Sequence, residues 1–264
     1  MNQPKNSAKP LVIAQFSDSH LFANINDLHY GTNVYQNLQQ VLADIAEQKH
    51  IDIIIFTGDL SQDHSEQSYK NFASAVKHVK LKVPVFFLAG NHDEFTLLNK
   101  YLHTPEFCAE KIVNTSAWQV HLLNSKSETP AGLVSKEELS KLKETIDQDK
   151  FQLLMMHHHP VDVGYFIDRH GLTNQADFWK CIDEMLKAKI KISAIACGHV
   201  HRASFLPKHT LHSLQSVDIY TCPATSIAFD PSKDTVSSLG VGASYRLLYL
   251  FADGSINSEI VIPT

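Results

Sequence analysis

The sequence has few cysteines, no excess of basic residues and no long apolar run. Its four cysteines, Cys108, Cys181, Cys197 and Cys222, show no CxxC spacing, which argues against a thiolate zinc site. The 23 Lys and Arg against 28 Asp and Glu give a formal net charge of −5, so no overall positive field attracts nucleic acid or an anionic membrane. No apolar run reaches the roughly 18 residues of a membrane span. We therefore expect neither nucleic acid nor a membrane as a partner, and a small anionic substrate would need local positive charge, such as metal ions.

The amino-terminal segment lacks the apolar core of a secretion signal, since residues 1–10 are mostly polar. Four cysteines would allow a disulfide framework, but a chain of 264 residues buries a sufficient core without one. We therefore expect reduced, mostly buried cysteines and a cytoplasmic location.

Five short segments each follow an apolar run and carry side chains that bind metal ions. They are Asp18-Ser19-His20, Gly58-Asp59, Gly90-Asn91-His92-Asp93, His157-His158-His159-Pro160 and Gly198-His199-Val200-His201. Carboxylate, amide and imidazole ligands suit divalent ions such as Mn, Fe, Mg or Zn. Two such ions together are well suited to the cleavage of phosphate esters.

Apolar runs and helical spacing alternate through most of the chain. Short apolar runs predict strands at 11–16, 51–57, 83–89, 118–124, 151–156 and 192–197, and helical spacing predicts helices at about 32–49, 63–79, 135–146 and 176–189. Asp63 and Ser135 each stand three residues before a Glu, which favours both as helix caps. Strands dominate after residue 217, with a hairpin turn at Ala252-Asp253-Gly254. The pattern predicts an α/β fold in one domain, residues 1–264.

Ligands in open α/β sheets bind beyond the carboxyl ends of the strands, which is where all five segments lie in this interpretation. Each segment alone is weak. Gly-Asp is commonly a turn, a capped helix start would also use Asn or Asp, and a lone His after a strand is more often a hydrogen-bonded core or rim residue than a ligand. Their combination, each after a strand, favours one shared site.

The five segments together resemble the calcineurin-like metallophosphoesterase superfamily over about residues 11–201. Longer stretches resemble its class III cyclic nucleotide phosphodiesterases over nearly the whole chain. They are residues 18–22, 58–63, 157–160 and 197–201, with Pro223-Ala224-Thr225-Ser226, Phe229-Asp230-Pro231 and Tyr245-Arg246. The resemblance implies a layered α/β/β/α sandwich of two mixed sheets flanked by helices. It also implies hydrolysis of 3′,5′-cyclic AMP to 5′-AMP, so the expected partner is a small cyclic nucleotide.

The resemblance also implies roles for individual residues. Asp18, His20, Asp59 and His201 would hold one divalent metal ion, and Asp59, Asn91, His157 and His199 a second, with Asp59 bridging. A hydroxide shared by the two ions would attack phosphorus in line with the leaving 3′-oxygen. His92 would stabilise or protonate that oxygen as the catalytic residue. Substrate would contact His20, Asp59, Asn91, His92 and His201.

Several alternatives stay open at this point. Asp93 would either orient His92 or a ligand, or serve as a helix N-terminal carboxylate, and His158 and His159 would either contact substrate or flank the site. A broader enzyme acting on other cyclic nucleotides or phosphodiesters is the main rival function. Enzymes that cleave the lipid A precursor UDP-diacylglucosamine usually carry Arg where His92 stands, and a non-catalytic relative would have lost ligands. The oligomeric state and the choice of metal also stay open.

Overall fold

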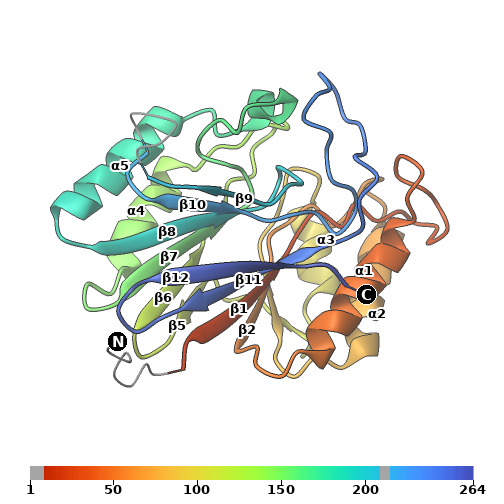
Figure 1. Ribbon diagram of the computed structural model, residues 1–264, viewed down its shortest axis with the longest axis horizontal. Coiled ribbons are helices and arrows are strands. Elements are labelled where there is room, and N and C mark those ends of the chain that lie inside the picture. Colours follow the sequence, from red (N-terminus) through yellow and green to blue (C-terminus); the bar gives the residue numbers. More distant parts are fainter. Residues whose placement is uncertain (1–8, 209–214, 264) are drawn as a thin grey trace, which may run out of the picture.

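Two six-stranded mixed sheets form the centre of the computed structural model, which describes residues 9–208 and 215–263 (Figure 1). The first sheet has the order β12-β11-β1-β2-β3-β4. Its strands are β12 (Ile256–Val261), β11 (Tyr245–Leu250), β1 (Leu11–Phe16), β2 (Ile53–Phe56), β3 (Val85–Phe87) and β4 (Phe107–Cys108). Strands β1 to β4 run parallel, whereas β11 and β12 are antiparallel to their neighbours.

The second sheet has the order β5-β6-β7-β8-β10-β9. Its strands are β5 (Ile112–Asn114), β6 (Trp118–Leu122), β7 (Phe151–Met156), β8 (Lys191–Cys197), β10 (Asp218–Thr221) and β9 (Ser204–Leu206). The four strands from β6 to β10 are parallel, and β5 and β9 are antiparallel edges. Each parallel set therefore places the carboxyl ends of its strands along one edge of its sheet.

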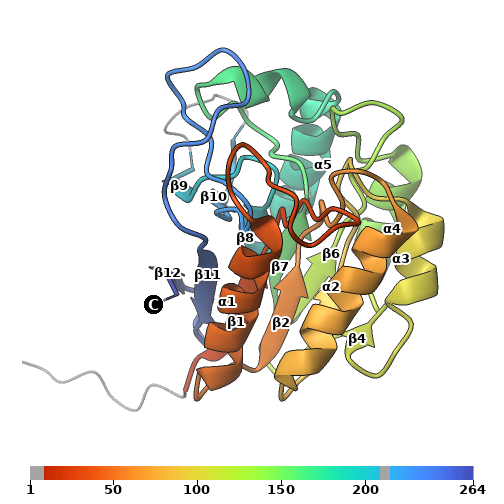
Figure 2. The ribbon, with the colours of Figure 1, turned by 90° about the vertical axis from the view of Figure 1, so that its right-hand side faces the viewer.

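Helices cover the outer face of each sheet. Helices α1 (Val34–Glu47), α2 (Glu66–Val79) and α3 (Phe95–Tyr101) lie over the first sheet, and α4 (Lys136–Thr145) and α5 (Gln175–Lys187) over the second. Figure 2 shows α1 and α2 side by side in front of β1 and β2. A short 3₁₀ helix, η1 (Phe166–His170), interrupts the long segment after β7. The predicted α/β sandwich of two mixed sheets flanked by helices is confirmed.

Alternation along the strands builds three apolar layers. In β1, Ala14 and Phe16 pack toward the helices, whereas Ile13 packs into the layer between the sheets. In β7, Leu153 enters the same central layer and Leu154 packs against α4 and α5. Successive side chains of a strand point to opposite faces, so an uninterrupted apolar run is what a strand buried on both faces requires.

One predicted helix cap is confirmed and the other is wrong. The Ser135 hydroxyl accepts the Glu138 backbone amide at 3.1 Å and caps α4. Helix α2 is capped instead by Ser65, whose hydroxyl accepts the amide of Ser68. Asp63 is occupied elsewhere, because its carboxylate accepts the amides of Ala23 at 2.7 Å and Ser65 at 3.0 Å. A contact 40 residues away in the chain therefore displaced the local capping pattern.

All four cysteines are unpaired, and three of them are buried, as expected from the sequence. Within residues 9–208 and 215–263, no helix is both long and apolar enough to cross a membrane. The polar segment 1–8, on which the absence of a secretion signal was argued, lies outside the described residues.

Candidate metal centre

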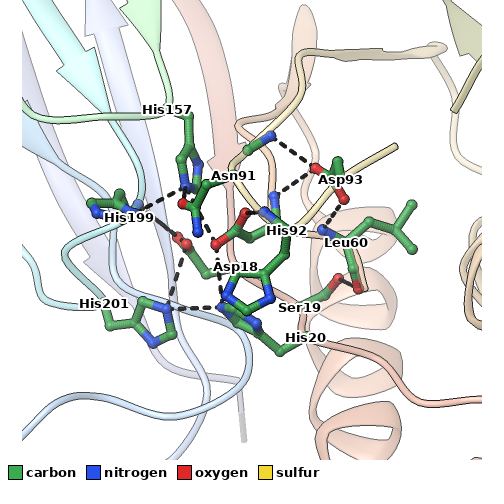
Figure 3. Close-up of polar contacts among 12 residues, drawn as sticks. Asp18, Ser19, His20, Leu60, Asn91, His92, Asp93, His157, His199 and His201 are labelled. Carbon is green, nitrogen blue, oxygen red and sulfur yellow. Dashed lines mark hydrogen bonds and ion pairs between the residues drawn. The ribbon is translucent and has the colours of Figure 1, made fainter. Parts of the chain in front are cut away.

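The five predicted segments follow β1, β2, β3, β7 and β8 and meet between the two sheets (Figure 3). Five of their residues have backbones in the left-handed region. The φ angles are 57° for Asp18, 45° for His20, 58° for Asp59, 66° for His199 and 57° for His201. This conformation costs a non-glycine residue about 1–2 kcal/mol. Such strain clusters at functional sites, where the surrounding structure holds it in place.

One group of side chains converges from the ends of β1 and β8. The Nε2 atoms of His20 and His201 lie 3.1 Å apart, and His201 Nε2 lies 3.5 Å from Asp18 Oδ1. All three residues are at least 96 % buried. The Asp59 carboxylate completes this group, with Oδ2 at 3.6 Å from His20 Nε2.

A second group lies on the other side of Asp59. His157 Nε2 is 3.4 Å from the same Asp59 Oδ2 atom and 3.1 Å from Asn91 Oδ1. His199 Nδ1 lies 3.1 Å from His157 Nε2. The other Asp59 oxygen, Oδ1, accepts the backbone amide of His92 at 2.9 Å, which fixes the orientation of the carboxylate. One oxygen of Asp59 is therefore shared between the two groups.

Two histidines are oriented by backbone carbonyl groups. His157 donates its Nδ1–H to the Thr57 carbonyl at 2.7 Å, and His201 donates its Nδ1–H to the Ile227 carbonyl at 2.8 Å. Each bond leaves the Nε2 lone pair directed into the site. Metal-binding histidines are commonly held in this way, because the second bond fixes the tautomer and the ring plane.

The separations within both groups fit a metal ion. With metal–ligand bonds of about 2.1 Å, neighbouring ligand atoms lie roughly 3.0–3.4 Å apart around a tetrahedral or octahedral ion. The observed contacts run from 3.1 Å, between His20 and His201, to 3.6 Å, between His20 and Asp59. Imidazole nitrogens packed this closely repel one another when protonated, whereas a shared cation satisfies them all.

Without a bound cation, electrostatics favour the metal-binding forms of His20, His199 and Asp59, but not those of Asp18 and His157. Burial lowers the pKa of His20 and His199 well below its usual range, so both imidazoles are neutral. Burial opposes ionisation of Asp59, but the adjacent His157 outweighs it and holds the pKa of Asp59 well below its usual range. Burial opposes protonation of His157, but Asp59 outweighs it and raises the pKa of His157 to about 9, while burial raises the pKa of Asp18 to about 7. Metal ligands must be deprotonated carboxylates and neutral imidazoles, so a bound cation would displace protons from these two groups. The described chain thus carries Asp and His clusters able to bind divalent metals.

Two glycines allow the segments to approach so closely. A Cβ atom on Gly90 would lie 2.1 Å from Asp59 Oδ1, and one on Gly198 would lie 2.2 Å from Ser17 Oγ. Neither position has room for a side chain. The glycines before the ligands are therefore required by the contact between neighbouring loops.

Asp93 joins the β2 and β3 loops through its carboxylate. Oδ2 accepts the backbone amides of Asp59 and Gly90, and Oδ1 accepts that of Leu60, each at 2.8 Å. Asp93 is fully buried. Of the roles left open for it, the structure favours orientation of a ligand, since Asp93 holds the backbone of Asp59 rather than the ring of His92.

His92 lies between two other histidine rings at the edge of the centre. Its ring meets His20 edge-on at 4.9 Å and stacks over His64 at 5.5 Å. Its Nδ1 atom is buried without a hydrogen-bond partner among the described residues. Burial lowers the pKa of His92. Its position leaves it free to act on a bound molecule.

The two histidines after His157 are buried and pack next to the proposed ligands. His158 accepts the Ser125 hydroxyl at Nδ1 (2.9 Å) and donates from Nε2 to the Pro130 carbonyl (3.2 Å). Both ring nitrogens are thereby occupied, so His158 does not serve as a ligand even though it lies near His157 and His199. His159 is fully buried and its ring stacks on His199 at 5.6 Å.

Sequence reasoning missed His29 and Lys126. The ring of His29 stacks on His20 at 5.5 Å, and Lys126 Nζ donates to the Asn91 carbonyl at 3.0 Å. His29 lies in an irregular stretch, 20–31, whose length alone marked it as a loop that shapes a site. Lys126 had no signal, because a lysine after a strand is ordinarily solvated.

A sandwich of two mixed sheets with Asp, Asn and His side chains converging at its strand ends defines a metal-dependent phosphoesterase. The sequence model of calcineurin-like phosphoesterases matches residues 11–203. The chain belongs to this family.

Two relatives named as phosphodiesterases support the class. The chain is 51 % identical to a "Probable cyclic nucleotide phosphodiesterase" of Colwellia psychrerythraea, over 96 % of this chain and 95 % of that protein. It is 30 % identical to the "3′,5′-cyclic adenosine monophosphate phosphodiesterase CpdA" of Vibrio vulnificus, over 96 % and 90 %. A dimetal phosphatase from Danio rerio superposes with a TM-score of 0.63 at 11 % identity, covering 97 % of this chain and 100 % of that one. This last likeness concerns the fold alone.

Proposed function

We propose that this protein is a dinuclear-metal phosphodiesterase that hydrolyses 3′,5′-cyclic AMP to 5′-AMP. The observation that carries the proposal is the position of Asp59 Oδ2, 3.6 Å from His20 Nε2 and 3.4 Å from His157 Nε2. A carboxylate oxygen placed between two groups of ligands suits a pair of cations. The relatives named as cyclic nucleotide phosphodiesterases support the substrate.

The proposed ligands form two groups that share Asp59. Asp18, His20, Asp59 and His201 hold one divalent ion, and Asp59, Asn91, His157 and His199 hold the other. When bound, the metal pair neutralises phosphate oxygens and lowers the pKa of water for attack on phosphorus. Mixed oxygen and imidazole ligands accept Mn, Fe, Mg or Zn, so availability selects among them.

His92 acts on the leaving group. Its backbone amide is fixed by Asp59, while its ring is held at the edge of the centre by His20 and His64. A hydrogen bond or a proton given to the departing 3′-oxygen at this position would keep the alkoxide from building up charge. His20, Asp59, Asn91 and His201 line the same space and complete the contacts to the phosphate.

The proposal extends to the organisation and location of the chain. We place the reaction in the cytoplasm, which the four unpaired cysteines support. We treat the chain as one domain, because Asp59 follows a strand of the first sheet and His157 a strand of the second, and both serve one centre. The proposed bounds, 1–264, extend into segments outside the described residues.

Incubation of the protein with Mn and a panel of phosphate esters tests the substrate. The panel contains 3′,5′-cyclic AMP, 3′,5′-cyclic GMP, 2′,3′-cyclic AMP and the monoester 3′-AMP, with products identified by chromatography. We expect 5′-AMP from 3′,5′-cyclic AMP. Equal turnover of all the diesters would favour the broader phosphodiesterase, and activity confined to 2′,3′-cyclic nucleotides or monoesters would refute the proposal.

A further inference from the structure

An open cavity of about 450 Å³ lies beside His92 and is not used by the metal ligands apart from Asn91, which contributes to its wall. Its volume falls within the about 300–1,000 Å³ of sites that bind small molecules. His64 and His92 form one wall, and the segment Lys126–Pro130 forms another. Because His92 is placed to act on the leaving 3′-oxygen, the part of the substrate attached to that oxygen must lie on this side of the centre.

The segment Lys126–Pro130 is held in place from below. Buried His158 accepts the Ser125 hydroxyl at one end of the segment and donates to the Pro130 carbonyl at the other. A Cβ atom on Gly132 would lie 2.4 Å from the His158 ring, so backbone packs directly on the imidazole. The wall is thus fixed to the residue that follows His157, and a ligand meets a surface that is already formed.

Lys126 places a positive charge at the inner end of the cavity. Its Nζ donates to the Asn91 carbonyl at 3.0 Å, which leaves ammonium protons for a ligand. Two carboxylates, those of Glu94 and Glu128, also line the cavity. A second phosphate group would be repelled by these carboxylates. A purine edge carries both hydrogen-bond acceptors and donors, so it matches a cavity lined by an ammonium group and two carboxylates.

Phe95 supplies an apolar surface in the same cavity. It follows Glu94 at the start of α3, and 46 % of it is exposed, unusually much for a phenylalanine. A nucleobase stacks on such a ring whatever its hydrogen-bonding edge. Phe95 can therefore contact the face of a nucleobase, and Lys126 can contact its edge.

We propose that this cavity binds the nucleoside half of the cyclic nucleotide, with Phe95 stacking on the base and Lys126 donating to one of its ring acceptors. Lys126 and Phe95 then determine specificity, whereas the metal ligands act on the phosphodiester. This inference rests on the proposed function and names the part of the substrate that each region recognises.

The test compares two substrates that share one phosphodiester ring. These are 3′,5′-cyclic AMP and the base-free analogue 1-deoxyribose 3,5-cyclic phosphate, each assayed with Mn on the full chain. The variants are Lys126→Met and Phe95→Leu, with Lys136→Met as the matched control on an exposed lysine of α4. Metal content is measured in every variant, so that a folding or metal defect is seen directly.

For the wild type we expect kcat/KM to be higher for cyclic AMP than for the base-free analogue. Lys126→Met and Phe95→Leu should each reduce this preference about tenfold, mainly through the KM for cyclic AMP, because each removes a contact to the base. Lys136→Met should retain it. An unchanged preference in both variants, or equal losses on the two substrates, would overturn the inference. Failure of the wild type to hydrolyse cyclic AMP would instead refute the proposed function and the inference with it.

Discussion

The carboxylate of Asp93 accepts the backbone amide of Asp59 at 2.8 Å and thereby holds in place the one side chain shared by both ligand groups. The same side chain accepts the amides of Leu60 and Gly90, so two strand-end loops are joined through one buried carboxyl group. The proposed bridging position of Asp59 thus depends on a residue that itself contacts no proposed ligand atom.

Replacement of Asp93 by Asn tests this dependence. Both oxygens of Asp93 accept backbone amides, and the Asn side chain keeps only one oxygen because its NH2 end cannot accept, so at least one of the three amides loses its partner inside the protein. We expect Asp93→Asn to lower the free energy of unfolding by about 2–3 kcal/mol, measured in urea with EDTA present so that metal binding does not contribute. Metal affinity should fall as well. The matched variant Asp63→Asn, whose bonds lie in an exposed turn, should lose less than half as much stability, and equal losses would contradict the role of Asp93.

His92→Ala separates the reaction from metal binding. The backbone amide that Asp59 accepts survives in this variant, but the ring beside the leaving group is lost. We expect kcat to fall about 10²–10⁴-fold with metal content unchanged. Asp59→Ala should lose both activity and metal, whereas His103→Ala, at an exposed position, should lose neither. Loss of both metal ions in His92→Ala would mean that His92 is itself a ligand.

Removal of metal should destabilise the protein. Without cations, the Asp18 and Asp59 side chains remain almost fully buried close to each other. We expect EDTA to lower Tm by on the order of 10 °C, and added Mn to restore Tm in a concentration-dependent way. Asp59→Ala is the control, because its Tm should respond little to EDTA or Mn. A wild-type Tm that is indifferent to both reagents would argue against a structural contribution from the ions.

The Lys111 side chain should make stability depend on pH on the alkaline side. Burial lowers the pKa of Lys111 from 10.5 to about 8, and its Nζ donates to the Phe87 carbonyl. The folded state therefore binds the proton less tightly than the unfolded state, so this group's contribution to stability rises as pH increases from 8 to 10.5. Relative to Lys111→Met, the wild type should gain about 2–3 kcal/mol across that window. Urea unfolding of both proteins at pH 7 and pH 10 measures the difference, and parallel pH profiles would refute the expectation.

The strands and the candidate ligands that follow them were predictable from the sequence. The long-range contacts that hold these ligands in place were not. Runs such as 11–16 and 151–156 are apolar on both faces of a buried strand apart from Gln15 and Gln152. Polar residues follow each run directly, so both the strand and the position of its ligands could be inferred. Asp63 shows the limit, since its capping pattern was locally correct but its carboxylate bonds to Ala23, 40 residues away. Strands β4, β5 and β9 have two or three residues each, too few for any period to appear.

The residues around the metal centre could not be predicted either, because their roles also depend on contacts between distant parts of the chain. His157 and His158 are neighbours in a run of three histidines, so the sequence cannot distinguish their roles. Only the fold does so. One is oriented by the Thr57 carbonyl toward Asp59, while the other fixes residues 125–130. The role of Lys126 likewise depends on a loop that His158 positions.

The left-handed backbones at both ends of Asp18-Ser19-His20 and His199-Val200-His201 bear on how such a centre could be transferred to another protein. Placing the same residues at the strand ends of an unrelated sheet would supply the ligand atoms. It would not supply the backbone turns that orient these atoms. In an ordinary extended backbone, alternate side chains point to one face and the intervening side chain points to the opposite face. A designer would have to build the reversed turns first, together with their close-packed glycines, and treat the histidines and aspartates as the last residues to be chosen.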